Sequence, residues 1–573
     1  MELLLKFRFL RRFVLFDVFL FLFIPAGLAE EKAYDFLIEN VLVFDGKSAQ
    51  GFEADVAISH EYIADVGNLS PVNAREVIDG EGWVLAPGFI DAHTHSDFNP
   101  FIYPRLANKL SQGVTTEIIG NCGMSAAPIL GGHSERIREI WAREGVLLPD
   151  KITWTTFKGY GEEVQLKGVR TNFIGLVGHG NLRSAVMGLS SRAASADEIQ
   201  QMKTMLTEAM GQGAFGISFG LRYLPGLYAK ENELIELCSE AARHEGVCAF
   251  HIRSERSAIL ESLREVIAIA EKSNAPVQVC HLKIAGEKNW PKIDDALGII
   301  EEARRRGVRI LADAYPYDSG YAELGISLPP PLYKREDRVE FFKNPSNRKK
   351  ILRAIRNYAK HDKTNWDTIM IASTRHPDYA AYQGQSIAAI ARQTHLTPEV
   401  FLMKILADTS FEVSAFYFSQ KQDIVDRIIA RPYVAIGSDS IADGGSQPHP
   451  RFYGTFPKMF RYYIRESEIL GLAETIQKMT SLVAEYYGVE RRGRIQTGYY
   501  ADLVLFDPET VTDLATYKNP TIPSRGIQWV FVNGRPAVRE GRLTDEKNGR
   551  LVLKHEYPYW FSSACPLPMG LLY

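Results

Sequence analysis

Cysteine is scarce in this sequence, with five residues among 573. The low, odd number excludes a disulfide framework, because disulfide-stabilised folds are short and carry many paired cysteines. The cysteines are Cys122, Cys238, Cys248, Cys280 and Cys565, and their spacing proposes no bridge. Cys122 ends an apolar stretch and lies between small residues in IIGNCGMS (118–125). A cysteine in such a place could be a disulfide half, a nucleophile, a metal ligand or an inert filler.

The sequence also has no large excess of acidic or basic residues. The formal net charge is -3, with 24% charged and 46% hydrophobic residues. Without a long basic run beyond the N-terminus, nothing supports a nucleic-acid partner. The composition is that of an ordinary globular chain, long enough for one large domain and a smaller one.

The N-terminal apolar run is too short to span a membrane comfortably. It covers residues 13–24, contains Asp17, follows four basic residues and precedes the small-residue stretch PAGLA (25–29). Those three parts are typical of a secretory signal. We therefore expect residues 1–29 to be a cleaved signal, the mature chain to be periplasmic or secreted, and that mature chain to need no membrane. One alternative is an uncleaved anchor. The other is a misassigned start, in which case the protein would be cytoplasmic.

Both ends of the remaining chain have a strand-like texture. Short β-branched and apolar runs separated by turn residues fill residues 34–79, and the same pattern returns at 498–508 and 526–538. This pattern predicts a small β-sandwich domain built from residues 33–85 and 486–555, followed by a tail at 556–573.

The middle of the chain alternates between short apolar strands and helical stretches with apolar residues at spacings of three and four. Eight such repeats predict a (β/α)8 TIM barrel over residues 86–485, within an α/β fold class. A flat doubly wound sheet is the alternative. The segment 328–412 is longer than one crossover needs, so we expect an insertion there, with IMIAS (369–373) as an extra strand. The predicted barrel strands are 88–95, 115–121, 171–180, 213–220, 246–253, 276–283, 308–317 and 432–440.

Polar residues gather at the carboxyl ends of these predicted strands, where barrels build their active sites. Five of the 13 histidines lie there. The residues at these ends are His93, His95, Cys122, His179, His251, His281 and Asp439.

Strand geometry predicts which of these side chains share a face. Alternation places His93 and His95 on the same side of their strand. The same rule sets Cys280 opposite His281, and Cys248 on the same side as Phe250, so we expect both cysteines to pack under the helices as small apolar groups. Cys122 lies beyond its strand and has no such structural role.

A His-x-His pair, a soft sulfur ligand and two further histidines form a set that suits zinc, which prefers imidazole and thiolate. Asp439 then has a chemical task, because a carboxylate beside a metal-activated water can take its proton and pass it to a leaving nitrogen. Any one of these histidines alone is more simply a hydrogen-bonded structural residue. Together they predict a metal site.

The motifs DAHTHSD, IIGNCG, AFHIRSE, VCHLK and AIGSDS occur in this order, and with them the chain resembles the amidohydrolase superfamily. More specifically it resembles the N-acyl-D-amino-acid deacylases (D-aminoacylases), over about residues 34–553. Further similar stretches are VGHGNLRSAVMG (177–188), QPHPRFYGTFPK (447–458) and RRGRIQTGYYADLVLFDPETVTD (491–513).

The resemblance implies a tight zinc ion held by Cys122, His251 and His281. It places His93, His95 and Asp439 at a neighbouring, weaker second metal site or catalytic side, with Asp439 as the acid/base. Related hydantoinases and dihydroorotases use a carboxylated lysine at the end of strand four. No lysine occurs here between Lys203 and Lys230, and Cys122 could take that bridging place.

The implied substrate is a small N-acyl amino acid of D configuration. Lys283 and Tyr315 match positions that hold its α-carboxylate, Tyr223 matches a pocket tyrosine, and His179 has a supporting role. Tyr315 could equally be barrel packing.

This sequence departs from the family at Gln385 and Tyr321, where the family often has arginine and serine. Acyl and side-chain preference therefore stay open. The other functions considered are a cyclic-amide hydrolase, a mononuclear deaminase, a dipeptidase acting on D-containing substrates, and a non-catalytic scaffold.

Overall fold

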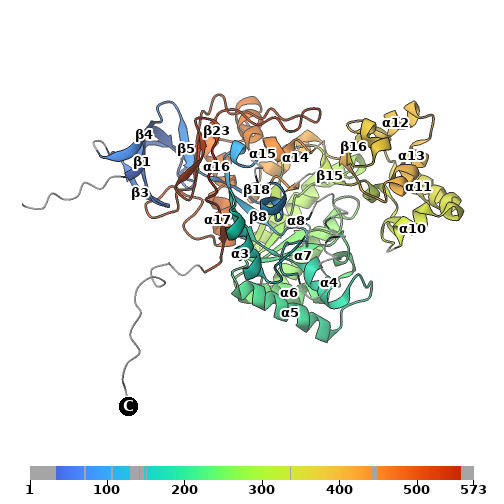
Figure 1. Ribbon diagram of the computed structural model, residues 1–573. Helices are drawn as coiled ribbons and strands as arrows, with labels where there is room; N and C mark the ends of the chain where they lie inside the picture. Colours follow the sequence, from blue (N-terminus) through green and yellow to red (C-terminus); the bar gives the residue numbers. More distant parts are fainter. Residues whose placement is uncertain are drawn as a thin grey trace, which may run out of the picture.

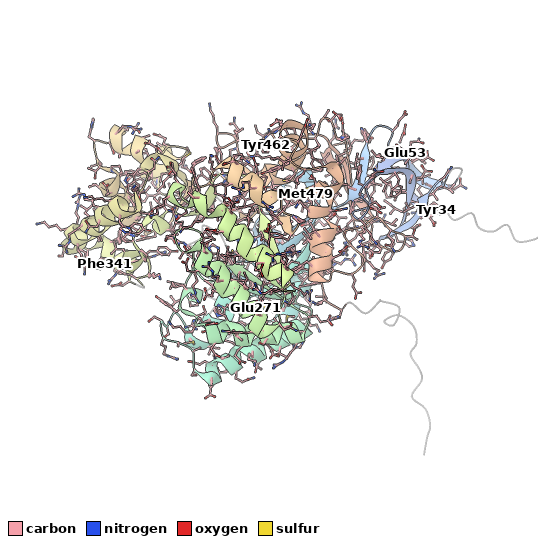
Figure 2. All side chains as sticks on the ribbon, turned by 180° about the vertical axis from the view of Figure 1, so that it is seen from behind. Tyr34, Glu53, Glu271, Phe341, Tyr462 and Met479 are labelled. Atoms are coloured by element: carbon pink, nitrogen blue, oxygen red, sulfur yellow. The ribbon has the colours of Figure 1, made fainter. Side chains whose placement is uncertain are left out.

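The computed structural model describes residues 34–69, 72–104, 108–129, 138, 141, 148–149, 151–335, 337–441 and 448–555. The predicted signal at 1–29 and the tail at 556–573 lie outside these residues. The described chain forms an elongated molecule with a β domain at one end, a barrel in the middle and an inserted subdomain at the other end (Figure 1). In the reverse view, Tyr34 and Phe341 mark the two extremes (Figure 2).

The barrel strands run parallel to one another. In the described chain they are β6 (Phe89–Asp91), β8 (Val114–Ile119), β9 (Asn172–Gly175) with its continuation β10 (Val177–Gly178), β11 (Gly216–Gly220), β12 (Val247–His251), β13 (Val277–Val279), β14 (Ile310–Ala314) and β18 (Val434–Ile436). Short β7 (Thr94–His95) and β19 (Ser440–Ile441) extend the first and last of them and pair with each other.

The sheet closes on itself. Backbone hydrogen bonds join β6–β8–β9 in one run and β10–β11–β12–β13–β14–β18 in another. The Phe215 amide donates to the Gly175 carbonyl at 2.9 Å, and the Ala92 amide donates to the Ile436 carbonyl at 3.1 Å. Closure confirms the predicted (β/α)8 barrel and excludes the flat doubly wound sheet, which would leave two open edges.

Alternate residues of each strand fill the barrel interior or face the helices. Ile90, Ile118, Val247 and Leu311 belong to one interior cluster. Their strand neighbours, such as Cys248, belong to the larger cluster beneath the helices. Both sets are buried, which explains why the strands read as continuous apolar runs.

Helices follow the strands and cover the outside of the barrel, and α5 to α8 lie side by side (Figure 1). Ser195 begins α5 with a capping box, in which its hydroxyl accepts from the Glu198 amide and the Glu198 side chain accepts from the Ser195 amide. The helices are α1 (Asn99–Ile102), α3 (Phe157–Lys167), α4 (His179–Met187), α5 (Ala196–Gly211), α6 (Glu231–Arg243), α7 (Ile259–Ser273), α8 (Ile293–Arg305), α14 (Gln422–Ile429), α15 (Arg451–Lys458), α16 (Leu472–Lys478) and α17 (Ser481–Tyr487).

The β domain draws its strands from both ends of the chain. β5 and β20 pair antiparallel and form the seam between the two contributions. Phe36 on β1 lies 5.1 Å from Phe531 on β21, centroid to centroid. Since two strands separate them in the sheet order, the sheet folds over on itself, as a sandwich requires. The strands are β1 (Tyr34–Val43), β2 (Phe52–Ser59), β3 (Tyr62–Gly67), β4 (Ala74–Asp79), β5 (Val84–Pro87), β20 (Leu503–Phe506), β21 (Ile527–Val532), β22 (Arg535–Arg539) and β23 (Arg542–Leu543).

The insertion has its own sheet and core. Its antiparallel sheet begins at Gly320 and ends at Tyr417, so it starts before the predicted residue 328 and ends after 412. The segment IMIAS lies in its strand β16. The elements are β15 (Gly320–Glu323), α9 (Pro330–Tyr333), α10 (Arg338–Lys343), α11 (Arg348–Asp362), β16 (Ile369–Thr374), α12 (Ile387–Gln393), α13 (Pro398–Asp408) and β17 (Val413–Tyr417).

A buried polar network joins the β domain to the barrel. Arg492 hydrogen-bonds to Asp502, and the Asn533 side chain donates to the Asn172 side chain at the base of the barrel, at 2.8 Å. The C-terminal strand β24 (Leu551–Val552) pairs with β9. Across the part of the chain that the structure describes, no helix combines the length and apolar character that a membrane crossing requires.

Candidate active site

Cys122 lies in a tight turn at the carboxyl end of β8. Gly120, Cys122 and Gly123 have φ angles of 77°, 54° and 77°. A Cβ at Gly120 would lie 2.1 Å from the Leu176 carbonyl oxygen, so a larger residue there would clash with the backbone. The turn thus carries the Cys122 side chain into the mouth of the barrel.

Three histidine nitrogens surround the sulfur of Cys122. Its Sγ lies 3.4 Å from His93 Nε2, 3.6 Å from His251 Nδ1 and 3.5 Å from His281 Nε2. All four side chains are buried. Strands β6, β8, β12 and β13 each deliver one of them, as the strand-end pattern predicts.

These separations suit a metal ion. Tetrahedral zinc holds sulfur at about 2.3 Å and nitrogen at about 2.0–2.1 Å, which places neighbouring sulfur and nitrogen ligands roughly 3.5–3.6 Å apart. The sets of donor atoms that lie within 4.8 Å of one another include His93 with Cys122 and His281, and His93 with His95 and Asp439. His93 belongs to both sets and therefore lies where two neighbouring cation positions would meet, with Cys122 as a donor of the first.

Asp439 faces the His-x-His pair. Its Oδ1 lies 3.4 Å from His95 Nε2 and 3.6 Å from His93 Nε2, and its Oδ2 lies 3.0 Å from Arg451 Nη1. Burial acts to raise the pKa of Asp439, but the charge of Arg451 and the hydrogen bond with His95 prevail and hold it well below its ordinary value. The carboxyl group is therefore ionised and able to accept a proton.

His281 is oriented by Glu255. His281 Nδ1 lies 2.9 Å from Glu255 Oε1, which leaves Nε2 directed at Cys122. Lys283 pairs with the same carboxylate oxygen at 2.5 Å. Burial opposes ionisation of Glu255, yet the charges of Lys283 and the two histidines hold its pKa well below normal. A carboxylate behind an imidazole is the arrangement that orients metal-ligating histidines.

The prediction for Cys280 is wrong. Its side chain belongs to the barrel interior and not to the cluster beneath the helices, whereas Cys248 does lie beneath the helices. Strand β13 ends at Val279, and His281 has a φ of 35°, so the period-two alternation stops before it reaches His281. Both Cys280 and His281 consequently face the barrel axis.

The remaining predicted residues divide between the pocket and its surroundings. Tyr223, Lys283 and Tyr315 line a cavity of about 90 Å³ with His95, Cys122, His251, His281 and Asp439. The ring of Tyr223 packs edge-on against His251 at 4.7 Å. His179 begins α4, pairs through Nε2 with Glu233 at 2.8 Å and is absent from the cavity lining.

Sequence reasoning missed Glu255, Arg451 and Arg222. Glu255 lies in the quoted motif AFHIRSE and Arg451 in QPHPRFYGTFPK, so both were within the recognised stretches. A charged residue that contacts a metal ligand only in the folded protein produces no periodic pattern in the sequence. Its place in the site becomes visible only once the fold is known. Arg222 lies beside the predicted Tyr223 and lines the same cavity.

Comparison with known proteins finds amidohydrolases that match most of the chain. The amidohydrolase family matches residues 76–322 and 351–538. A D-aminoacylase of Alcaligenes xylosoxydans xylosoxydans is 33% identical over 528 residues, 92% of this chain and 99% of that protein. An N-acyl-D-glutamate deacylase of the same organism is 33% identical over 521 residues, 90% of this chain and 97% of that protein. A solved N-acyl-D-glutamate deacylase from Bordetella bronchiseptica, complexed with zinc and a phosphonate inhibitor, has a TM-score of 0.77 at 32% identity and covers 91% of this chain and 100% of that one.

Proposed function

Because the chain belongs to the amidohydrolase family, we propose that it hydrolyses the amide bond of N-acyl-D-amino acids, giving a carboxylate and a free D-amino acid. The observation that carries this proposal is the convergence of Cys122, three histidines and Asp439 at the barrel mouth. Relatives that match almost the whole chain are named for the same reaction.

The residues fit zinc as the metal. Cys122, His251 and His281 would hold the tight ion, and His93, His95 and Asp439 would form the weaker second position. A bound zinc ion supplies Lewis acidity towards the scissile carbonyl and lowers the pKa of a water molecule. The imidazole and thiol donors, and their spacing around Cys122, support this assignment.

Asp439 would carry the proton. Its Oδ1 faces the histidines and the cavity, while Arg451 holds its Oδ2 and fixes the plane of the carboxylate. The ionised carboxylate takes a proton from the attacking water and then delivers it to the amine nitrogen as the amide bond breaks. His95 and Arg451 keep the carboxylate pointed at the site throughout.

Lys283 and Tyr315 would hold the α-carboxylate of the substrate. Lys283 Nζ lies 5.7 Å from the centroid of the Tyr315 ring, so the two polar groups face the same part of the cavity. Burial opposes the charge on Lys283, but Glu255 raises its pKa and keeps the ammonium charged. A charged amine and a phenol are suitable donors to a carboxylate.

Cyclic-amide hydrolysis is the less favoured reaction. Strand β11 has the sequence GISFG, so it offers no lysine for a carboxylated bridge. The anionic ligand that this site offers instead is the Cys122 sulfur, which lies among three histidine nitrogens.

The test combines metal analysis with paired substrates. Purified protein should contain zinc, hydrolyse N-acetyl-D-amino acids and leave the N-acetyl-L isomers intact. Asp439→Asn should keep its zinc and lose activity by at least about 100-fold, within the range that a general acid/base supplies. Unchanged deacylation by Asp439→Asn, or activity confined to L substrates, would contradict the proposal.

A further inference from the structure

Arg222 is a cation of the substrate cavity that the proposed reaction does not use. It follows β11 in a turn and lines the cavity beside Tyr223 and His251. The turn is fixed, because the Leu221 amide donates to the His251 carbonyl at 3.0 Å and the Tyr223 amide donates to the Gly220 carbonyl at 3.1 Å. The half-buried Arg222 is therefore held at the cavity by its backbone.

The carboxylates that line the cavity already have partners. Glu255 pairs with Lys283 at 2.5 Å and with His281 at 2.9 Å. Asp439 pairs with Arg451 at 3.0 Å and faces the His-x-His pair. Neither carboxylate lies within ion-pair distance of Arg222.

The other cations of the cavity are neutralised by carboxylates. Lys283 has Glu255, and Arg256 lies 3.3 Å from Asp362 at the end of α11. Arg222, by contrast, has no acidic partner within 4 Å among the residues that the structure describes. An unpaired guanidinium that is partly withdrawn from water loses hydration without gaining a counter-ion, and a bound carboxylate would restore that balance.

The surroundings of Arg222 are positive. Burial lowers the pKa of Lys334 at the end of α9, and the charges of Arg222 and Arg253 lower it further. Arg253 is itself held by Glu265 at 2.8 Å. Lys334 and Arg222 thus repel each other, which favours an anion beside them.

The position proposed for the α-carboxylate is elsewhere in the cavity. Tyr315 lies beside Lys283 and 4.6 Å from the guanidinium of Arg451. Burial raises the pKa of Tyr417, a cavity residue from the insertion, and the charges of Arg256 and Arg222 oppose that rise. Burial lowers the pKa of His251, and the charge of Arg222 also lowers it. Arg222 therefore lines the same cavity as Lys283, and a substrate whose single carboxylate is held by Lys283 and Tyr315 would leave Arg222 without an anion.

We propose that Arg222 binds a second carboxylate of the substrate, the one on the amino-acid side chain, so that the protein prefers N-acyl-D-glutamate or N-acyl-D-aspartate over neutral N-acyl-D-amino acids. This inference rests on the proposed deacylation and specifies its substrate class. Arg222 is then a specificity-determining residue, and it takes no part in the proton transfers of Asp439.

The kinetic test compares N-acetyl-D-glutamate, N-acetyl-D-leucine and N-succinyl-D-leucine as substrates. Arg222→Leu should lower kcat/KM for N-acetyl-D-glutamate by about 10–150-fold, the range for one hydrogen bond to a charged group, and leave N-acetyl-D-leucine within about threefold. Arg222→Lys should restore part of the loss. The matched control is Arg264→Leu, an exposed arginine on α7, which should change no substrate.

Other outcomes overturn the inference. Equal losses on all three substrates would make Arg222 a structural residue. A loss on N-succinyl-D-leucine instead of N-acetyl-D-glutamate would place the second carboxylate on the acyl group. A wild-type protein that prefers N-acetyl-D-leucine would exclude an acidic side-chain pocket.

A binding measurement separates this inference from the proposed reaction. Isothermal titration of zinc-loaded Asp439→Asn with N-acetyl-D-glutamate and N-acetyl-D-leucine needs no turnover. Tighter binding of the glutamate compound, lost when Arg222→Leu is added, supports the Arg222 site even if no deacylation is found. Equal binding of the two compounds contradicts it even if deacylation is confirmed.

Discussion

Three residues of the site reach it through a left-handed backbone. Cys122, His281 and Asp439 have φ angles of 54°, 35° and 49°. Such conformations cost a non-glycine residue about 1–3 kcal/mol each and persist only where the surroundings impose them. The packed strands below and the turns above supply that constraint, so the backbone positions these side chains before any ion binds.

At the residue scale, Cys122→Ala should abolish tight zinc binding, because it removes the sulfur that contacts all three histidines. The zinc dissociation constant should rise by more than about 100-fold, beyond what loss of an outer-sphere partner costs. Zinc content after dialysis against a chelator, measured by mass spectrometry, gives the answer.

The control for that substitution is Cys248→Ala. Cys248 is fully buried beneath the helices, so its loss tests the general cost of removing a buried thiol. It should keep its zinc. If Cys248→Ala loses zinc as readily as Cys122→Ala, the effect reflects lost packing and the assignment of Cys122 as a ligand fails.

At the element scale, the turn after β8 presses against the end of β11. A Cβ at Gly220 would lie 2.1 Å from the Cys122 carbonyl oxygen. Gly220→Ala must therefore push the two strand ends apart and displace the cysteine. We expect weaker zinc binding in folded protein, measured by competition with a chelator, together with a near-native circular dichroism spectrum.

Gly298→Ala, by contrast, should stabilise the fold and leave the zinc site unchanged. Gly298 lies inside α8, and a Cβ there meets no atom within 4 Å. Alanine is the better helix former by about 1 kcal/mol, so unfolding should require more denaturant and zinc affinity should not change. A Gly298→Ala protein with altered zinc affinity would show that glycine substitution perturbs the site from any position.

The sequence predicts the barrel well, because each strand is a short apolar run and most of the runs end in a polar residue. The positions of His93, His95 and Cys122 follow from that rule alone. Cys280 does not, since a single positive φ at His281 breaks the alternation. Glu255 and Arg451 also escape prediction, because their role depends on which strand ends meet in space. The insertion sheet begins at Gly320, between the predicted strand 308–317 and the predicted start of the insertion at 328.

At the scale of the whole molecule, Asp502 links the β domain to the barrel, because its carboxylate accepts a hydrogen bond from the Asn172 side chain at 3.1 Å and pairs with Arg492 of its own domain. Arg492 and Asp502 are each 3% exposed. Asp502→Ala would leave the guanidinium buried without its counter-ion, which costs about 3–5 kcal/mol. The free energy of unfolding, from urea titration followed by fluorescence, should fall by that amount.

The control for Asp502→Ala is a substitution in the surface ion pair Arg170–Asp545. Asp545 is fully exposed and lies 3.8 Å from Arg170, so Asp545→Ala should leave the urea midpoint unchanged. Equal midpoints for Asp502→Ala and the unaltered protein would mean that the network contributes nothing to joining the two domains.

The seam between β5 and β20 also has a consequence during synthesis. β5 ends at Pro87, and its partner β20 begins at Leu503. At about 5–20 residues per second, the ribosome takes roughly 20–80 s to make the chain between them. Throughout that time the hydrogen-bonding edge of β5 has no partner from its own chain, and an open edge can pair with a neighbouring polypeptide. Because both ends of the chain close this domain, the edge of β5 is exposed to mispairing until the C-terminal strands have been made.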